Sequence, residues 1–123
     1  MSLHVKKITK ILSKKVNLKK NDLVLDIASN DGTLLNNYNK NIITFGIDPI
    51  LDKYKKYYKN INYRKNDFFS KNAVKSKTKN KFKIITALSV FYDSLDPNKF
   101  LRDVKKLLRN DGVFLLEFAD LAS

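Results

Sequence analysis

Short apolar runs alternate along the chain with segments of helical spacing, and this alternation constrains the fold more than any other feature. Strands are predicted at residues 23–27, 42–47, 61–63, 82–88 and 113–118. Helices are predicted at residues 3–15, 33–38, 50–58 and 96–108, and residues 70–81 predict a short helix or a connection. Asp96 is the expected N-cap of the last helix, and residues 110–112 are the expected turn after it. Short strands joined by helices need right-handed crossovers and form parallel sheets. We therefore expect one α/β domain over residues 1–123, with an N-terminal helix in 1–19 and a core of about five strands in 20–123.

Composition narrows the class of protein. The formal net charge is +13, and the chain has no cysteine, which excludes disulfides and thiolate metal sites. A basic domain can bind nucleic acid. However, lysine is spread along the whole chain and arginine, which usually reads bases and phosphates, is scarce. We interpret the charge as a solvated surface and keep nucleic-acid binding as the alternative. We expect no metal site.

The sequence also bears on location. No apolar run approaches the ~20 residues that span a bilayer. The N-terminus lacks the apolar stretch and small residues of a secretory signal. We therefore expect a cytoplasmic protein that does not associate with membranes.

Polar residues end the predicted strands, where ligands bind in open α/β sheets. Asp26 begins a loop of small residues that ends at Gly32. Such a loop lets backbone amides approach a ligand, and Asn30 and Gly32 can adopt left-handed backbone angles. We predict a ligand-binding loop, with an ordinary strand-to-helix turn as the alternative.

Two later strand ends add candidate contacts. Asp48 follows the second strand about twenty residues on, a spacing that suits a carboxylate bound to ribose hydroxyls. Its other reading is a helix N-cap before Pro49. Asp67 could accept a hydrogen bond from the amino edge of an adenine, and the ring of Phe68 could stack on its face. The alternative is that Phe68 or Phe69 packs in the core.

The charge of the first loop favours one kind of ligand. The loop lacks the Gly-Lys-Ser/Thr ending of a phosphate-cradling loop. Asp26 and Asp31 would repel a pyrophosphate, which makes a nicotinamide-dependent oxidoreductase the least favoured reading. They suit a ligand with a cationic amino group. S-adenosylmethionine has that group, a sulfonium and a ribose.

These residues resemble a known family. Residues 24–35, Val-Leu-Asp-Ile-Ala-Ser-Asn-Asp-Gly-Thr-Leu-Leu, resemble the first motif of the sugar C-methyltransferases, which are class I S-adenosylmethionine-dependent methyltransferases. Residues 46–49, 84–93 and 96–117 resemble later stretches of the same fold. The resemblance covers roughly residues 20–120. It implies a Rossmann-like class I methyltransferase fold and S-adenosylmethionine as cofactor.

The resemblance also implies roles for individual residues. The loop would wrap the methionine end of the cofactor, Asp48 would hold the ribose, and Asp67 with Phe68 would meet the adenine. The residues after the fourth strand would line the cofactor and face the substrate. The expected cofactor-binding residues are Asp26, Ala28, Ser29, Asn30, Asp31, Gly32, Asp48, Pro49, Asp67, Phe68, Leu88 and Ser89.

The chain departs from the family in ways that bear on activity. Ala28 stands where the family has glycine, which would narrow the loop. We also expect the family's N-terminal zinc region, its C-terminal substrate region and the C-terminal strands of the class I fold to be missing. An exposed sheet edge would then favour a homodimer.

The function that these patterns favour is methyl transfer to a small molecule, and a sugar carbon is the narrower hypothesis. The alternative is a non-catalytic basic module that binds nucleic acid or a partner protein. C-methylation needs a general base. Tyr92, Asp93 and Glu117 are candidates, but ordinary loop and strand-end roles are favoured for them, and His4 is expected to be an exposed helical residue. No catalytic residue is assigned.

Overall fold

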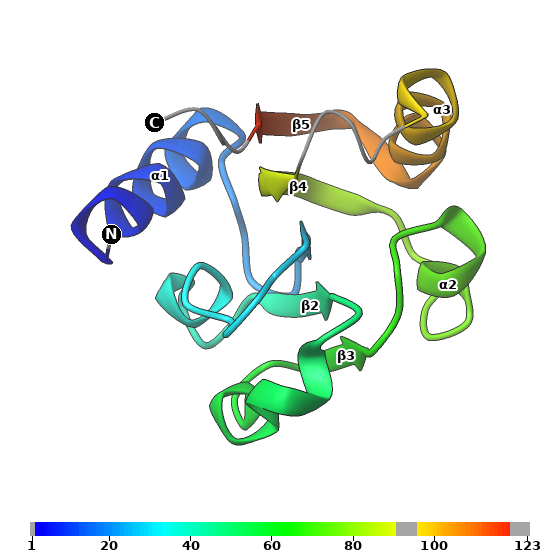
Figure 1. The fold of residues 1–123 in the computed structure, drawn as a ribbon. Helices are drawn as coiled ribbons and strands as arrows, with labels where there is room; N and C mark the ends of the chain where they lie inside the picture. The colour runs from blue at the N-terminus through cyan, green and yellow to red at the C-terminus, as the bar shows by residue number, and fades with distance from the viewer. Residues whose placement is uncertain (1, 91–95, 119–123) are drawn as a thin grey trace.

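Five parallel strands form one sheet in the order β3-β2-β1-β4-β5 (Figure 1). The computed structural model describes residues 2–90 and 96–118. The strands are β1 (Leu23–Ile27), β2 (Ile43–Ile47), β3 (Tyr63–Lys65), β4 (Phe82–Val90) and β5 (Leu108–Phe118). The helices are α1 (Ser2–Lys15), α2 (Lys71–Lys75) and α3 (Pro97–Leu107), with 3₁₀ segments η1 (Leu35–Asn37) and η2 (Leu51–Tyr58). The predicted parallel α/β sheet is confirmed.

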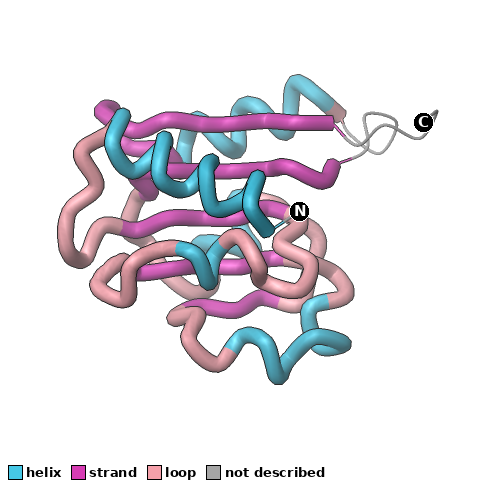
Figure 2. Tube along the Cα trace, turned by 90° about the vertical axis from the view of Figure 1, so that its left-hand side faces the viewer, coloured by secondary structure: helices cyan, strands magenta, loops and turns pink. Residues whose placement is uncertain are grey.

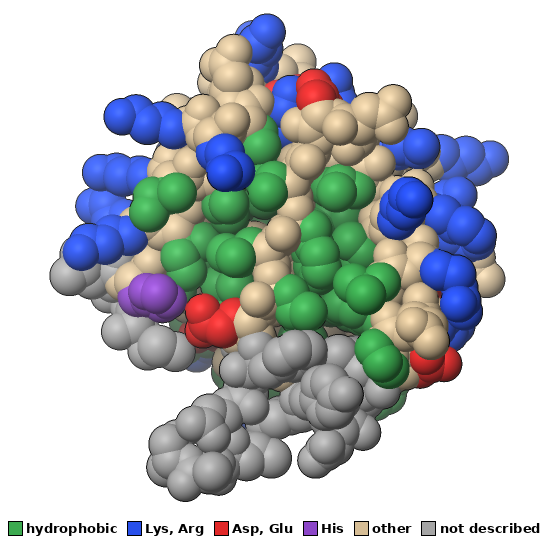
Figure 3. All heavy atoms as spheres, turned by 90° about the horizontal axis from the view of Figure 1, so that it is seen from above, with side chains coloured by type: hydrophobic (Ala, Val, Ile, Leu, Met, Phe, Trp, Pro, Cys, Tyr) green, Lys and Arg blue, Asp and Glu red, His purple; other side chains and the backbone are tan. Residues whose placement is uncertain are grey.

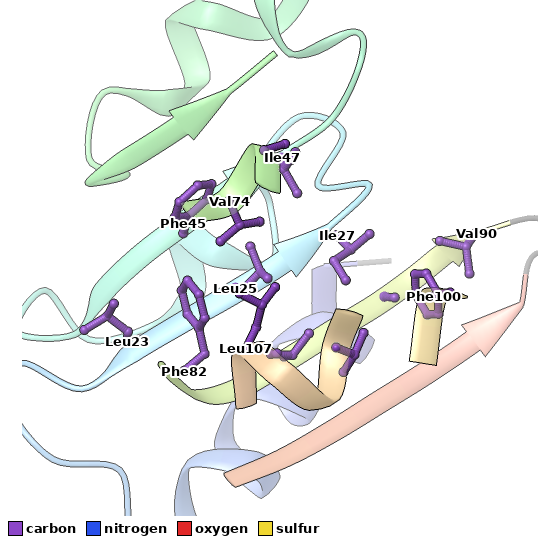
Figure 4. Packing of buried hydrophobic residues seen from close by; sticks show 14 residues of the cluster. Leu23, Leu25, Ile27, Phe45, Ile47, Val74, Phe82, Val90, Phe100 and Leu107 are labelled. Carbon is purple, nitrogen blue, oxygen red and sulfur yellow. The ribbon is translucent and has the colours of Figure 1, made fainter. Parts of the chain in front are cut away.

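The sheet is covered on both faces because successive strand residues point to opposite sides. Leu23, Leu25 and Ile27 of β1 pack with Val74 of α2 and Phe100 of α3 (Figure 4). Val24, from the same strand, packs with Leu12 of α1, Leu35 of η1 and Tyr58 of η2. Both faces of β1 therefore lie in apolar surroundings, which explains why this strand is a continuous apolar run apart from Asp26.

Helix α1 runs across one face of the sheet, and its N-terminal end lies at the edge where β4 and β5 end (Figure 2). Thr9 and Leu12 of this helix are buried, whereas Ile11 is 64% exposed. None of the helices in the described residues is long and apolar enough to cross a membrane.

Several element boundaries differ from the sequence prediction. The two helices expected at 33–38 and 50–58 are short 3₁₀ segments, and η2 is kinked at Tyr54, whose backbone angles are not helical. The third strand begins at Tyr63 instead of Ile61, because Tyr63 is the first residue paired with β2, opposite Phe45. Asp96 caps α3 as expected, since its side chain accepts a hydrogen bond from the Lys99 amide.

The expected turn at residues 110–112 is instead part of β5, with a break in register opposite β4. Lys83 of β4 donates a hydrogen bond to Asp111 over 2.7 Å, and the carboxylate also pairs with Arg109. Gly112 lies so close that a Cβ would come within 2.9 Å of the Lys83 carbonyl oxygen. These contacts hold the turn-forming residues against the neighbouring strand.

Gly46 in β2 leaves room for the aromatic ring that covers the sheet at this point. A Cβ at this position would lie 2.8 Å from the Tyr58 ring and 3.0 Å from Ser29 Oγ. Tyr58 is fully buried, so it cannot move aside into solvent. Glycine is therefore required here by packing, since the strand backbone itself is ordinary.

Gly46→Ala is expected to lower the free energy of unfolding by about 1–3 kcal/mol, because the added methyl overpacks a filled site. Urea denaturation followed by circular dichroism measures the change. Asn60→Ala, at an exposed position, is the control and should shift stability by less than about 0.5 kcal/mol. Equal stability of Gly46→Ala and the wild type would contradict the packing argument.

Candidate functional site

The loop after β1 alternates between ordinary and left-handed backbone conformations. Ala28, Asn30 and Gly32 have φ angles of 58°, 54° and 78°. The amides of Ala28 and Ser29 both donate to the Ile47 carbonyl at the end of β2, over 2.9 and 3.2 Å. This folds the loop tightly against the neighbouring strand. The left-handed angles predicted for Asn30 and Gly32 are confirmed, and Ala28 adopts one as well.

Asp48 joins the first two strand-end loops. Its Oδ2 accepts a hydrogen bond from the Asn30 amide over 2.9 Å, and its Oδ1 accepts one from the Ile50 amide over 2.8 Å. The side chain is only 6% exposed. The second bond closes the turn before η2, whose N-cap residue is Ile50 and has no side-chain cap, so the alternative of Asp48 as a helix N-cap is not borne out. Each carboxylate oxygen retains a second lone pair for another donor.

Tyr58 holds the loop from its other side. Its hydroxyl donates to the Asn30 carbonyl and lies 2.8 Å from Ser29 Oγ. Since a phenol has one proton, Ser29 must donate to Tyr58. Burial raises the pKa of Tyr58 above its ordinary value, so the donating form persists. The sequence prediction did not include Tyr58, because nothing local distinguishes it from the neighbouring tyrosines of η2.

Asp26 is a buried carboxyl group at the base of the loop. It is 5% exposed, and Thr86 of β4 donates a hydrogen bond to its Oδ1 over 2.8 Å. Burial raises the pKa of Asp26 to about 7, against the opposing effect of the Thr86 bond, and the nearby charge of Asp48 adds to the increase. A carboxyl group with this pKa changes between its protonated and its ionised form near neutral pH.

A cleft of about 270 Å³ opens above Asp26. It combines the β1 loop with the first turn of α1 and the ends of β4 and β5. Its lining residues are His4, Val5, Asp26, Ala28, Ser29, Asn30, Asp31, Thr33, Leu34, Leu88 and Glu117. Among the described residues, three carboxyl groups and one histidine therefore face this space, and no lysine or arginine does. Since lysine and arginine make up 25 of the 123 residues, their absence from the lining is unusual.

Six of the twelve predicted site residues line the cleft: Asp26, Ala28, Ser29, Asn30, Asp31 and Leu88. Gly32 and Asp48 belong to the loops that follow β1 and β2 but do not line the cleft. Pro49, Asp67 and Phe68 lie outside its lining. The side chain of Ser89 and all of residues 91–95, including Tyr92 and Asp93, fall outside what the structure describes.

Asp67 and Phe68 follow β3 at the surface. Asp67 Oδ1 accepts a hydrogen bond from the Phe68 amide, and the Phe68 ring is 74% exposed. Phe69 is the aromatic residue that joins the core, with its ring 5.5 Å from that of Phe100. The alternative of core packing therefore applies to Phe69 and leaves Phe68 available to a ligand.

His4 and Glu117 reach the cleft from opposite ends of the chain. His4 is exposed, as expected, yet it lines the space above Asp26. Sequence reasoning could not place it there, because the position depends on how α1 crosses the sheet. Among the described residues, no group of three or more acidic, histidine or cysteine side chains is arranged to hold a metal ion.

Comparison with protein families decides the class. Residues 3–123 match the family model described as a methyltransferase domain. The chain belongs to this methyltransferase domain family. No curated protein matches the sequence.

Several solved structures share the fold of this domain. DesVI of Streptomyces venezuelae superposes with a TM-score of 0.72 at 16% identity, covering 96% of this chain and 50% of that one. An S-adenosylmethionine-dependent methyltransferase of Clostridium acetobutylicum gives 0.67 at 20% identity, covering 90% and 48%. The plantazolicin methyltransferase BamL, solved with a desmethyl analogue and S-adenosylhomocysteine, gives 0.65 at 20% identity, covering 89% and 43%. The methyltransferase domain thus spans about half the length of these proteins or less.

Ala28→Gly is expected to raise the free energy of unfolding of the methyltransferase domain by about 0.5–1 kcal/mol. Glycine adopts φ 58° without the strain that a Cβ imposes, which outweighs its greater entropy in the unfolded chain. Thermal and urea denaturation measure the gain. Ala73→Gly within α2 is the matched control and should destabilise, since helical glycine costs about 1 kcal/mol. Destabilisation by both variants would contradict the assignment of strain to Ala28.

Asp26→Asn is expected to stabilise the domain at pH 8 by roughly 2–4 kcal/mol and to have little effect near pH 4. The folded-state pKa of Asp26, about 7, lies above the ordinary 3.8. As the pH rises through this interval the unfolded chain loses its proton first, so the wild type loses stability that the neutral amide keeps. Urea denaturation across this pH range measures the difference. Parallel curves for the two proteins would show that Asp26 does not titrate in this way.

Proposed function

We propose that the chain binds S-adenosylmethionine at the cleft above Asp26 and forms the cofactor-binding part of a small-molecule methyltransferase. The observation that carries the proposal is a cleft in a strongly basic domain whose described lining contains Asp26, Asp31 and Glu117 but no lysine or arginine. Such a site favours a cationic ligand and disfavours a pyrophosphate. Membership in the methyltransferase domain family favours methyl transfer over a non-catalytic nucleic-acid module.

Asp26 fits the amino group of the cofactor's methionine half. Its carboxyl group is buried, lines the cleft and has one oxygen held by Thr86. An ammonium placed beside it would stabilise the ionised form and lower its pKa from about 7. Asp31 is oriented by two hydrogen bonds from Thr33, from the amide and from the hydroxyl, and it presents a second negative charge to the same space.

The adenosyl half is assigned to the neighbouring strand ends. Asp48 would accept ribose hydroxyls through the lone pairs that the Asn30 and Ile50 amides leave unused. Asp67 and the exposed ring of Phe68 would meet the adenine edge and face. Pro49 and Ser89 complete the proposed set at the same carboxyl edge of the sheet.

The chemistry then depends mainly on proximity and orientation. S-adenosylmethionine, when bound, supplies a methyl group on a sulfonium. The chain's own contribution is to hold the cofactor against Leu88 and the β1 loop and to keep lysine and arginine side chains away from the positively charged sulfonium. Glu117 and His4 border the cleft and are the described residues best placed to accept a proton from an acceptor. Of the three bases considered from the sequence, Tyr92 and Asp93 lie outside the described residues and Glu117 lines the cleft, where His4 joins it from the structure.

A small-molecule acceptor is supported by the plantazolicin methyltransferase, which was solved with a desmethyl analogue of its substrate. A sugar carbon is the narrower hypothesis, and it is supported by the Ser29-Asn30-Asp31-Gly32 loop that resembles the sugar C-methyltransferases.

Binding of S-adenosylhomocysteine is expected to release a proton near pH 6.5, because the ligand's ammonium ionises Asp26. Isothermal titration in two buffers of different ionisation enthalpy measures both the affinity and the proton count. 5′-Methylthioadenosine, which lacks the amino acid, should bind without proton release. Asp26→Asn should weaken S-adenosylhomocysteine binding at least about tenfold and abolish the release.

Asp52→Asn is the matched control, since Asp52 is an exposed carboxylate of η2 outside the cleft. It should leave both affinity and proton release unchanged. Absence of S-adenosylhomocysteine binding at about 1 mM would contradict the proposed cofactor. Tight binding with no proton release would retain the cofactor but remove the role of Asp26.

A further inference from the structure

A groove between η1 and η2 lies where β2 and β3 begin, at the opposite edge of the sheet from the cleft above Asp26. It has a volume of about 450 Å³. It is lined by residues from the middle of the chain: Leu35, Asn36, Tyr38, Asn39, Lys40, Ile42, Thr44, Lys56, Tyr57, Lys59, Asn60 and Asn62. The structure describes every residue of the range 35–62, so the walls and floor of the groove rest on described residues alone.

The groove is open because the segments beside it are short. The segment η1 ends before Tyr38, whose backbone angles are extended, so the chain turns away from the beginning of β2. Asn36 Nδ2 donates a hydrogen bond to the Tyr57 carbonyl over 3.1 Å, which ties η1 to η2. At the floor, the Thr44 amide donates to Asn62 Oδ1 over 2.9 Å. These bonds join separate elements and hold the groove in shape.

Positive charge in the groove is not offset by acidic side chains. Lys40, Lys56 and Lys59 line it, and they form no ion pair within residues 2–90 and 96–118. The segments that supply the lining, residues 35–47 and 53–66, contain no aspartate or glutamate. Lysine and arginine side chains also lie on several sides of the face shown in Figure 3. Charge alone therefore does not identify a site, and the other groups of the groove must decide.

The asparagine side chains of the groove add hydrogen-bond donors. Asn62 Oδ1 accepts the Thr44 amide, and Asn39 Oδ1 accepts the Asn41 amide over 3.2 Å. Since these bonds use the carbonyl oxygens, they leave the amide nitrogens of Asn39 and Asn62 available as donors. Ammonium groups together with oriented amide donors favour an anion that has several acceptor oxygens, as phosphate has.

An exposed aromatic ring borders the same groove. Tyr57 is 50% exposed, and Lys56 Nζ lies over its ring, 5.1 Å from the centroid. A flat ring beside an ammonium group suits a nucleotide, because the base stacks on the ring and the phosphate meets the charge. An acidic peptide would satisfy the charge but would leave the ring unused. The combination of groups therefore favours a nucleic acid with unpaired bases over an acidic peptide.

We propose that this groove binds a short single-stranded segment of nucleic acid without reading its sequence. Lys40, Lys56 and Lys59 contact phosphates, the asparagine amides donate to phosphate or sugar oxygens, and Tyr57 stacks on a base. Lysine suits this role because it meets a phosphate as a point charge, and such contacts position a strand without specifying bases. The groove is separate from the cleft, so the proposal does not depend on cofactor binding, and the bound strand is a partner of the domain and not the proposed methyl acceptor.

Fluorescence anisotropy with a labelled uridine oligonucleotide of about eight residues measures the binding. The double variant Lys56→Gln with Lys59→Gln should weaken it at least about tenfold and reduce the slope of log affinity against log salt by about 1.4, since each phosphate contact to a single strand contributes about 0.7. The double variant Lys77→Gln with Lys79→Gln is the matched control. It removes the same charge from exposed positions after α2, which packs on the other face of the sheet, and it should leave affinity and slope unchanged.

Tyr57→Leu separates stacking from charge attraction. It should weaken binding at least about fivefold at every salt concentration, with no change in the salt slope, because it removes the aromatic surface and no charge. Tyr57→Phe keeps the ring and should bind like the wild type. Thermal denaturation, which these exposed substitutions should leave unchanged, checks that each variant is folded.

Three results would overturn the proposal. A glutamate peptide of equal charge that binds as tightly as the oligonucleotide would assign the groove to an acidic peptide. Equal losses of affinity in the two lysine variants would show that the strand binds over the whole basic surface. Full binding by Tyr57→Leu would leave only charge attraction to phosphate, without a site for an unpaired base.

Discussion

The carboxylate of Asp48 holds the candidate site together. By accepting the Asn30 amide on one oxygen and the Ile50 amide on the other, it connects the loops that follow two neighbouring strands. Tyr58 fixes the same Asn30 through its carbonyl and is itself packed over Gly46. One loop residue is thus held at both its amide and its carbonyl, and the left-handed angles around it persist because these bonds determine them.

The two buried carboxyl groups of the site have different hydrogen-bond donors. Asp48 receives two backbone amides. Asp26 has one hydroxyl donor, and burial raises its pKa to about 7. Retaining a carboxyl group in this position costs stability at neutral pH, as functional sites often do. In the proposed function, the ligand's ammonium would offset that cost on binding.

The parts of the structure that the sequence predicted are those encoded locally. The apolar run at 23–27, the Asp96 cap and the loop between Asp26 and Gly32 could all be read because neighbouring residues determine them. Five of the six predicted site residues that line the cleft belong to this loop, and the sixth, Leu88, joins them because β4 lies parallel to β1. The contributions of Tyr58 and His4 depend on contacts across η2 and α1, and the choice between Phe68 and Phe69 depends on the position of Phe100. None of these follows from local pattern.

The path of α1 has a consequence for how the domain assembles. His4 lies near the beginning of the chain and Glu117 near the end of the last strand, yet both border the same cleft. A molecule bound there touches segments that are far apart in sequence, and it can bind fully only after the helix has docked on the finished sheet. Ligand binding would then favour the docked state by mass action. A ligand bound in the cleft would therefore indicate that α1 has docked on the completed sheet.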